Sequence, residues 1–198
     1  MYQGKKISLV IPARNEERLI GPTLEGATET IDRIYVIDDG STDNTAEVVG
    51  KYASIDPRVE LIQHEENRGV GQAIITGYLR SSEDGYDISV VVGGDNQMPL
   101  EQVEDLLDPI IEGKADYTKG NRFLMPDTGL EDMPWTRMFP NAMISAMTKV
   151  ASGYYKIFDV VDGFTAISKR GIDLVDWSKA WKGYGYPMDF LVRLNGYG

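Results

Sequence analysis

The chain has 198 residues, of which 42% are hydrophobic, and its 31 acidic and 20 basic side chains give a formal net charge of −11. This length and this hydrophobic content suit one domain with a sizeable core, and they exclude wholesale disorder. The acidic charge excludes nucleic acid as a partner, because binding phosphates needs a basic patch, and it leaves peripheral membrane contact to apolar surface or a local basic patch.

Apolar runs and helix-like segments alternate through the first 122 residues. The expected strands are residues 7–11, 34–37, 59–63, 88–92 and 116–122. The expected helices are residues 17–30, 42–53, 71–81 and 99–112, the second of them capped by Ser41 or Thr42. Short strands that alternate with longer helices predict an α/β domain with a central, mostly parallel sheet flanked by helices.

After residue 122 the pattern changes. Residues 125–134 are typical of a loop, 135–155 of a helix, 160–168 of a strand that returns to the sheet and 187–194 of a final helix. No repeat or interdomain linker interrupts the chain, so we expect a single domain over residues 1–198. Residues 194–198 show neither a helix stop signal nor a polar tail, and we expect the natural sequence to continue after Gly198.

The chain contains no cysteine. Disulfides, thiolate metal ligands and a cysteine nucleophile are therefore excluded, and a reducing, cytoplasmic setting is expected. His64 is the single histidine, and we assign it no catalytic role.

Polar residues follow four of the expected strands. They form the segments 12–16, 38–41, 65–69 and 93–97. Because the carboxyl ends of parallel strands meet at one edge of a sheet, where ligands bind in such folds, we expect these segments to surround one site.

Two adjacent carboxylates, Asp38 and Asp39, end the second expected strand. The Asp-Gly-Ser sequence that follows is typical of a turn and a helix cap, which accounts for Gly40 and Ser41. A turn does not account for the second carboxylate, since like charges repel at a strand end. A ligand that donates hydrogen bonds, such as a ribose or a base edge, would account for both, and the sequence leaves the two interpretations open.

Asp95 follows an apolar strand and two glycines. A carboxylate there is costly unless it is paired or bound to a metal, and Gln97 could supply a second oxygen ligand. The alternative is that Asp95 caps the helix that starts near Pro99. A dinucleotide site is not indicated, because no Gly-x-Gly-x-x-Gly follows the first strand, and close packing equally explains Gly69 and Gly71.

Four segments in this order resemble a known family. They are Pro12-Ala-Arg-Asn-Glu16, Val36-Ile-Asp-Asp-Gly-Ser-Thr-Asp-Asn-Thr45, Asn67-Arg-Gly69 and Gly93-Gly-Asp-Asn-Gln-Met-Pro99. Together they resemble family-2 glycosyltransferases of the GT-A type, whose fold is Rossmann-like. The Asp95–Pro99 ending and Gly120-Asn-Arg-Phe123 resemble the polyprenyl-phosphate branch, typified by dolichyl-phosphate mannose synthase.

The resemblance implies a role for residues 1–122 in binding a nucleotide sugar. The implied donor-binding residues are Pro12, Ala13, Arg14, Glu16, Asp38, Asp39, Arg68 and Asp95. Asp95 and Gln97 would also hold Mg²⁺ or Mn²⁺ against the donor diphosphate, where the metal acts as a Lewis acid. The family often carries Asp-x-Asp here, and this chain has Gly93 at the first Asp; Arg14 likewise replaces an aromatic residue often found in the first motif.

Residues 123–198 would form the acceptor part. Arg122 and Arg137 are the candidates for binding an acceptor phosphate, with a surface ion pair as the alternative for each. Asp162-Gly163-Phe-Thr resembles the family's segment beneath the acceptor, and Gly183–Asp189 resembles the segment that brings a late carboxylate to the sugar. Asp189 is thus the candidate base for a hydroxyl acceptor, and capping of the last helix is its alternative.

The implied reaction is an inverting transfer of mannose or glucose from a nucleoside-diphosphate sugar to a polyprenyl phosphate such as dolichyl phosphate. The implied catalytic residues are Asp95, Asp189 and Arg122. We expect the enzyme at the cytoplasmic face of a membrane, and we expect segments after Gly198 to make any peripheral membrane contact. Two alternatives remain open: transfer to a sugar or protein hydroxyl, and a nucleotide-binding protein without catalysis.

Overall fold

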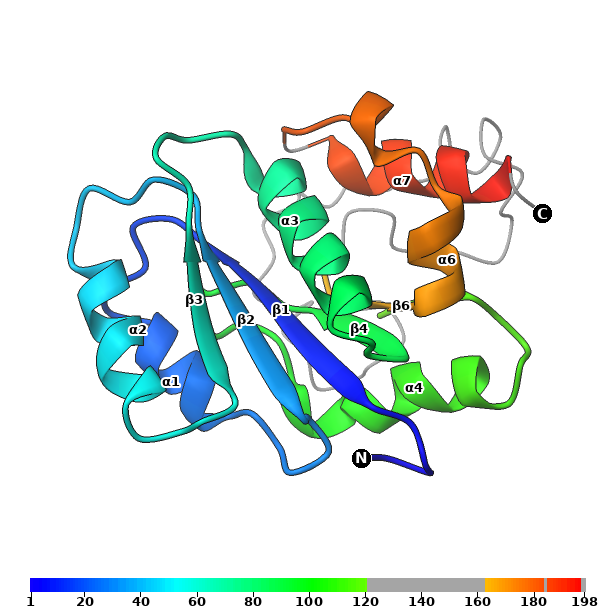
Figure 1. The fold of residues 1–198 in the computed structure, drawn as a ribbon, viewed down its shortest axis with the longest axis horizontal. Coiled ribbons are helices and arrows are strands. Elements are labelled where there is room, and N and C mark those ends of the chain that lie inside the picture. The colour runs from blue at the N-terminus through cyan, green and yellow to red at the C-terminus, as the bar shows by residue number, and fades with distance from the viewer. Residues whose placement is uncertain (121–162, 184, 197–198) are drawn as a thin grey trace, which may run out of the picture.

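A computed structural model describes residues 1–120, 163–183 and 185–196, and within them six strands form one sheet (Figure 1). The strands are β1 (Ile7–Ala13), β2 (Arg33–Asp38), β3 (Val59–Gln63), β4 (Ile88–Val91), β5 (Tyr117–Lys119) and β6 (Thr165–Ser168). Their spatial order is β3-β2-β1-β4-β6-β5. Strands β1 to β4 run parallel, whereas β6 runs antiparallel to β4 and β5. The expected mostly parallel α/β sheet is confirmed.

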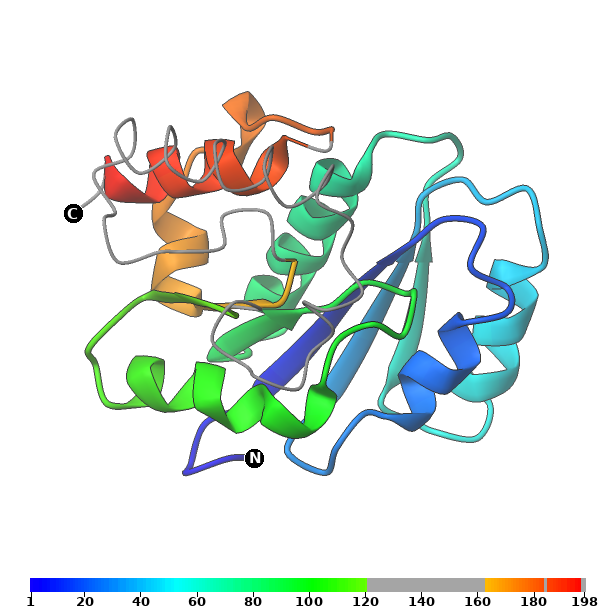
Figure 2. The same cartoon turned by 180° about the vertical axis from the view of Figure 1, so that it is seen from behind.

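Helices cover both faces of this sheet, so the fold has three layers (Figures 1 and 2). On one face lie α1 (Ile20–Glu25), α2 (Thr45–Ala53) and α4 (Val103–Ile111), the last preceded by a 3-10 turn at Leu100–Gln102. On the other lie α3 (Val70–Glu83), α6 (Lys169–Leu174) and α7 (Tyr186–Asn195). A 3-10 turn at Trp177–Lys179 joins α6 to the loop before α7, and neither it nor α6 was expected from the sequence.

Alternation along the strands divides the core between these two faces. Leu9 and Ile11 of β1 pack toward α1, α2 and α4, whereas Val10 packs toward α3. Both groups are fully buried. Near-continuous apolar runs are the expected pattern for parallel strands that are covered on both faces.

The first strand is longer than its sequence predicts, because it continues through Pro12 to Ala13. The ladder shows why a proline is tolerated in a central strand. Asp39 N donates to Ala13 O at 2.9 Å, so the polar backbone groups of Ala13 face β2 and those of Pro12 face β4. The pairing of β1 with β4 ends at Val10 and Val91, so no ladder hydrogen bond is lost at Pro12.

Two helices are shorter than predicted. Helix α2 begins at Thr45, not at residue 42, because Asp43 accepts from Thr45 N at 3.0 Å. Neither Ser41 nor Thr42 caps it, so that prediction is wrong. Helix α1 spans Ile20–Glu25 only, and the remainder of the predicted segment 17–30 is loop.

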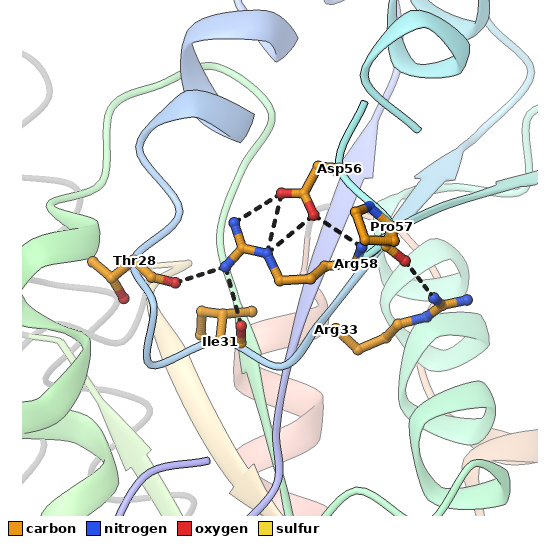
Figure 3. Close-up of polar contacts among 6 residues, drawn as sticks. All are labelled: Thr28, Ile31, Arg33, Asp56, Pro57 and Arg58. Carbon is orange, nitrogen blue, oxygen red and sulfur yellow. Dashed lines mark hydrogen bonds and ion pairs between the residues drawn. The ribbon is translucent and has the colours of Figure 1, made fainter. Parts of the chain in front are cut away.

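Arg58 braces the loop after α1 at the edge of the sheet opposite the carboxyl ends (Figure 3). Its Nη1 donates to Thr28 O at 3.0 Å and to Ile31 O at 3.1 Å. Its Nε and Nη2 make a forked pair with Asp56, with Nη2–Oδ2 at 2.8 Å. Arg33 Nη1 also donates to Pro57 O, at 3.0 Å. Arg58 therefore holds the loop after α1 in place, and the amino ends of β2 and β3 are held together.

Several predicted features lie outside the described residues. They are the loop at 125–134, the helix at 135–155, and the parts of two strands at 121–122 and 160–162. Within the described part of the chain, no helix is both long enough and apolar enough to span a bilayer.

Candidate active site

A cavity of about 580 Å³ opens at the carboxyl ends of β1 and β4. Strand β2 lies on one side of β1 and β4 on the other, so this is the point where the strand order reverses. Ligands of open α/β sheets bind at such a point. The amino end of α3 and the first turn of α7 also contribute to the wall, through Gly69, Val70, Tyr186 and Pro187.

The end of β1 and the segment that follows it form one wall of the cavity. Of the predicted donor-binding residues, the structure places Pro12, Ala13, Arg14 and Glu16 in this wall. The segment is fixed to the turn after β2: Asn15 N donates to Ser41 Oγ at 2.9 Å, and Glu16 N donates to Thr45 Oγ1 at 2.8 Å. Ser41 and Thr45 thus hold the loop that shapes the wall.

Asp38 and Asp39 are both buried, but they have different surroundings. Asp38 accepts from Ser41 N at 3.0 Å and from Gln63 Nε2 at 3.3 Å, and it is not part of the cavity wall. Asp39 lines the cavity. The structure therefore gives Asp38 the turn-closing geometry and places the second carboxylate at the site.

Asp39 joins the end of β2 to the loop before α3. Its Oδ1 accepts from Arg68 N at 2.8 Å and contacts His64 Nδ1 at 2.8 Å, while its Oδ2 accepts from Gly69 N at 2.8 Å. Arg68, predicted to bind the donor, takes part through its backbone, and its side chain is exposed outside the cavity wall. Asn67 belongs to the Asn67-Arg-Gly69 segment but was not among the predicted donor-binding residues, and it does line the cavity.

Asp95, which follows β4, also lines the cavity. Glu16 lies near it, since a Cβ atom on Gly94 would be 3.5 Å from Glu16 Cγ. Partial burial raises the pKa of Glu16 above its ordinary value, and the negative charges of Asp95 and Asp43 raise it further. Two carboxylates thus line the same cavity, and Asp95 lies close enough to disfavour the ionised form of Glu16.

These carboxylates suit a hard divalent cation. Mg²⁺ and Mn²⁺ accept one or two protein carboxylates and complete their shell with water and substrate phosphates. No group of three or more histidine, cysteine or acidic side chains arranged for a metal occurs among the described residues, so a cation here would depend on the ligand's own oxygens. Gln97 is exposed and outside the cavity wall, with its backbone N 3.3 Å from Asp95 Oδ1.

The glycines at the start of α3 allow another segment of the chain to approach closely. Gly71 N donates to Lys182 O at 2.8 Å. A Cβ atom on Gly69, whose φ is +92°, would fall 2.3 Å from Lys182 O, and one on Gly71 would fall 2.6 Å from Trp181 O. These positions need glycine because segment 181–183 packs against the helix, and Gly183 of that segment lines the cavity.

Asp189 does not line the cavity. Its Oδ2 accepts from Trp181 N at 2.8 Å and from Arg193 Nε at 2.6 Å, and its Oδ1 accepts from Arg193 Nη2 at 3.2 Å. The same Arg193 nitrogen also donates to Lys179 O. In this arrangement Asp189 fastens the loop before α7 to the helix itself.

The side of the cavity that the sequence predicts to receive an acceptor lies only partly within the described residues. Gly163 lines it, and a Cβ atom there would lie 3.0 Å from Met98 Cε and 3.5 Å from the Tyr186 hydroxyl. Tyr186 is fixed by an edge contact with buried Phe190, with ring centroids 5.3 Å apart. Arg122 and Arg137 lie outside the described residues. Met98 and Tyr186 fall within motifs quoted from the sequence, but only the fold shows that they face the cavity.

Comparison with known proteins identifies the family. The model of "Glycosyl transferase family 2" matches residues 8–174. UDP-N-acetylglucosamine–dolichyl-phosphate N-acetylglucosaminyltransferase of Methanococcus voltae is 32% identical over 95% of this chain and 79% of its own length. Polyprenol monophosphomannose synthase of Mycolicibacterium smegmatis is 28% identical over 93% of this chain and 70% of its own.

The fold agrees with this assignment. Glucosyl-3-phosphoglycerate synthase of Mycobacterium tuberculosis, solved with Mn²⁺, UDP and glucosyl-3-phosphoglycerate, superimposes with a TM-score of 0.70 at 22% identity. The match covers 95% of this chain, which spans 64% of that solved chain. The chain therefore belongs to glycosyltransferase family 2, the enzymes that transfer sugars from nucleotide-sugar donors, and it has the GT-A-like fold expected from its sequence.

Proposed function

We propose that this chain transfers a hexose, with inversion, from a nucleoside-diphosphate sugar to a polyprenyl phosphate such as dolichyl phosphate. The observation that carries the proposal is the meeting of Arg14, Glu16, Asp39 and Asp95 around one cavity at the switch point of the sheet. Its relatives support the acceptor class, because those compared above are named for transfer to dolichyl phosphate and for polyprenol monophosphomannose synthesis.

The donor binds between the end of β1 and the start of α3. Asp39 offers the remaining lone pair of its Oδ2 atom to a hydroxyl or base N–H donor of the nucleoside. Arg14 supplies a positive charge in a wall that otherwise carries the carboxylates of Glu16, Asp39 and Asp95. The amino end of α3 adds its partial positive charge near the diphosphate.

Asp95 is the residue that would hold Mg²⁺ or Mn²⁺, with Glu16 as the neighbouring carboxylate. A cation bound there neutralises charge on the departing nucleoside diphosphate. Mn²⁺ is present in the solved glucosyl-3-phosphoglycerate synthase, which shares the fold. Gln97 enters this proposal only if its exposed side chain turns toward Asp95 when the donor binds.

The acceptor enters beside Gly163, Met98 and Tyr186, which lie together in the cavity wall. A phosphate monoester is mostly ionised near neutral pH, so it attacks the sugar without a strong general base. This chemistry assigns Arg122 and Arg137 to the acceptor phosphate and leaves Asp189 its structural role. Because such an acceptor is a lipid, we place the reaction at the cytoplasmic face of a membrane.

Release of nucleoside diphosphate tests this function. The protein is given Mn²⁺, one of UDP-N-acetylglucosamine, UDP-glucose or GDP-mannose, and a short-chain, water-soluble polyprenyl phosphate. We expect release that requires both a donor and the phosphate, with the matching polyprenol as the control acceptor. Equal release with the polyprenol would favour the hydroxyl-acceptor alternative, and diphosphate binding without turnover would favour a binding protein.

Asp95→Asn provides the matched protein control. It keeps the size of the side chain and removes its charge. We expect it to abolish Mn²⁺-dependent donor binding and turnover while the unfolding midpoint in urea stays within the range of a surface substitution. Wild-type turnover in this variant would contradict the metal assignment.

A further inference from the structure

His64, the single histidine of the chain, lies just after β3 and links the donor cavity to α3. Its side chain is 5% exposed, as is that of Asp39. The imidazole contacts Asp39 Oδ1 through Nδ1 at 2.8 Å and Thr76 Oγ1 through Nε2 at 3.0 Å. Its backbone N donates to Asp38 O at 2.9 Å, so the backbone of His64 continues the pairing of β2 with β3.

Asp39 has two further donors, and both are backbone groups of the loop before α3. Arg68 N and Gly69 N each donate to its carboxylate at 2.8 Å. Among the described residues, His64 is thus the one that contacts this carboxylate through its side chain, whereas the loop contributes backbone amides. Moving Asp39 would move Gly69, which also lines the cavity.

We propose that His64 is a positioning residue for the nucleotide-sugar donor: its Nδ1–H holds Asp39, and through Asp39 the 67–69 backbone, in the geometry that receives the nucleoside diphosphate. The proposal rests on the proposed function, because it takes the cavity to be the donor site. It gives the imidazole no contact with the substrate.

Hydrogen counting fixes which ring nitrogen carries a proton. A carboxylate only accepts, so the contact with Asp39 requires Nδ1–H. Thr76 Oγ1 donates to Gln72 O at 3.0 Å, and this hydroxyl has a single hydrogen. Three hydrogen bonds connect Asp39, His64, Thr76 and Gln72 O in series, and they form together only when Nε2 is protonated as well as Nδ1. If the ring is neutral, the Thr76 hydroxyl can bond either to Nε2 or to Gln72 O, but not to both. Both states have Nδ1–H, and the Nε2–H tautomer alone is excluded.

The two amide substitutions separate the two ends of the ring. In His64→Asn the side-chain amide lies near the position of Nδ1 and can still donate to Asp39. In His64→Gln the amide lies near the position of Nε2 and reaches Thr76 instead. Thr76→Val removes the hydroxyl with little change of shape, so it tests the anchor alone. Only His64→Gln removes the donor to Asp39 while a polar side chain remains.

Titration calorimetry with UDP, and separately with GDP, in the presence of Mn²⁺ measures the effect. We expect His64→Gln to weaken binding roughly tenfold, in line with the loss of a hydrogen bond to a charged group. His64→Asn should restore most of the affinity, and Thr76→Val should weaken it about threefold or less. Equal losses in His64→Asn and His64→Gln, or no loss in either, would overturn the proposal.

Two measurements on the free protein do not depend on the ligand. Amide hydrogen exchange at Arg68 and Gly69 should quicken in His64→Gln and remain slow in His64→Asn. The ¹⁵N resonances of the single imidazole should show Nδ1 protonated, and an unprotonated Nδ1 would overturn the proposal.

If His64→Gln does not fold, Thr76→Val and the imidazole resonances of the wild type still decide it. A wild type that binds neither diphosphate overturns the proposed function, whereas the exchange rates still decide whether His64 holds the loop.

Discussion

A Cβ atom on Gly93 would lie 2.9 Å from Asp95 Oδ1 and 3.4 Å from its Cγ. A side chain at position 93 would thus project toward the carboxylate that faces the cavity. The atom it meets is the far end of a flexible side chain, which can turn aside. An aspartate at position 93, the first of the family's Asp-x-Asp pattern, would therefore stand beside Asp95 once the Asp95 side chain turns aside.

Gly93→Asp is expected to tighten Mn²⁺ binding about tenfold in the presence of UDP, because affinity for hard cations rises with the number of charged ligands. Gly93→Asn is the control, since it has the same size without the charge. Calorimetric titration of Mn²⁺ into the UDP-saturated protein gives both affinities. Equal affinities for the two variants would show that position 93 does not reach the cation.

Asp39→Asn and Asp38→Asn should differ, although the residues are neighbours. An amide at position 39 places an NH₂ group against donors, because both of its oxygens accept from N–H groups. We expect UDP affinity to fall roughly 10- to 100-fold, the cost of losing a hydrogen bond to a charged group. Asp38→Asn can still accept from Ser41 N, and we expect less than about a threefold change. Calorimetry decides, and equal losses would place Asp38 in the site.

The alternation of apolar strands with helices predicted the sheet and the edge at which the cavity lies, because parallel strands bring their carboxyl ends together. The choice between Asp38 and Asp39 could not be made in the same way. Neighbouring residues at a strand end point in different directions, and the donors of Asp39 lie 25 to 30 residues away. The partners of His64, 25 and 12 residues away, are equally invisible in sequence.

Other differences between the prediction and the structure involve features that are visible in the sequence. Asp189 and Arg193 stand at i and i+4 on a helix, a spacing typical of an ion pair, and the pair forms. Pro12 suggested the end of β1, yet its missing N–H faces the side where the ladder has already ended. The loop that follows the short α1 is held by Arg58, which lies 27 and 30 residues from the two carbonyls that accept its hydrogen bonds.

Glu16 should make the free energy of unfolding depend on pH, because burial and nearby carboxylates change its pKa in the folded protein. Burial and Asp95 raise its pKa, so the folded carboxyl binds its proton more tightly than the unfolded one. The free energy of unfolding should therefore fall as pH rises from the ordinary value of 4.5 through the raised pKa. Glu16→Gln should remove this slope and stabilise the protein above that window by about 0.5 kcal/mol or less, since solvent screens the charge.

Urea unfolding of wild type and Glu16→Gln between pH 4 and pH 8 (roughly the range over which a raised carboxyl titrates) measures the effect. Parallel stability curves for the two proteins would contradict it. Added Mn²⁺ and UDP should stabilise the wild type more than the variant, if Glu16 contributes its charge to the cation site.

Asp189→Asn separates a structural carboxylate from a catalytic base. The carboxylate accepts from Trp181 N and pairs with Arg193, and both charged side chains are about one quarter exposed, so the pair contributes little beyond about 1 kcal/mol. We expect Asp189→Asn to lower the free energy of unfolding by about 0.5–1 kcal/mol and to leave kcat with a short-chain polyprenyl phosphate within about threefold of wild type.

Arg193→Gln removes the same ion pair from the other side, so it should match Asp189→Asn in both urea unfolding and kcat. A general base contributes about 10²–10⁴-fold. A fall of that size in Asp189→Asn, without a similar fall in Arg193→Gln, would show that Asp189 turns into the cavity during the reaction and that the acceptor is a hydroxyl.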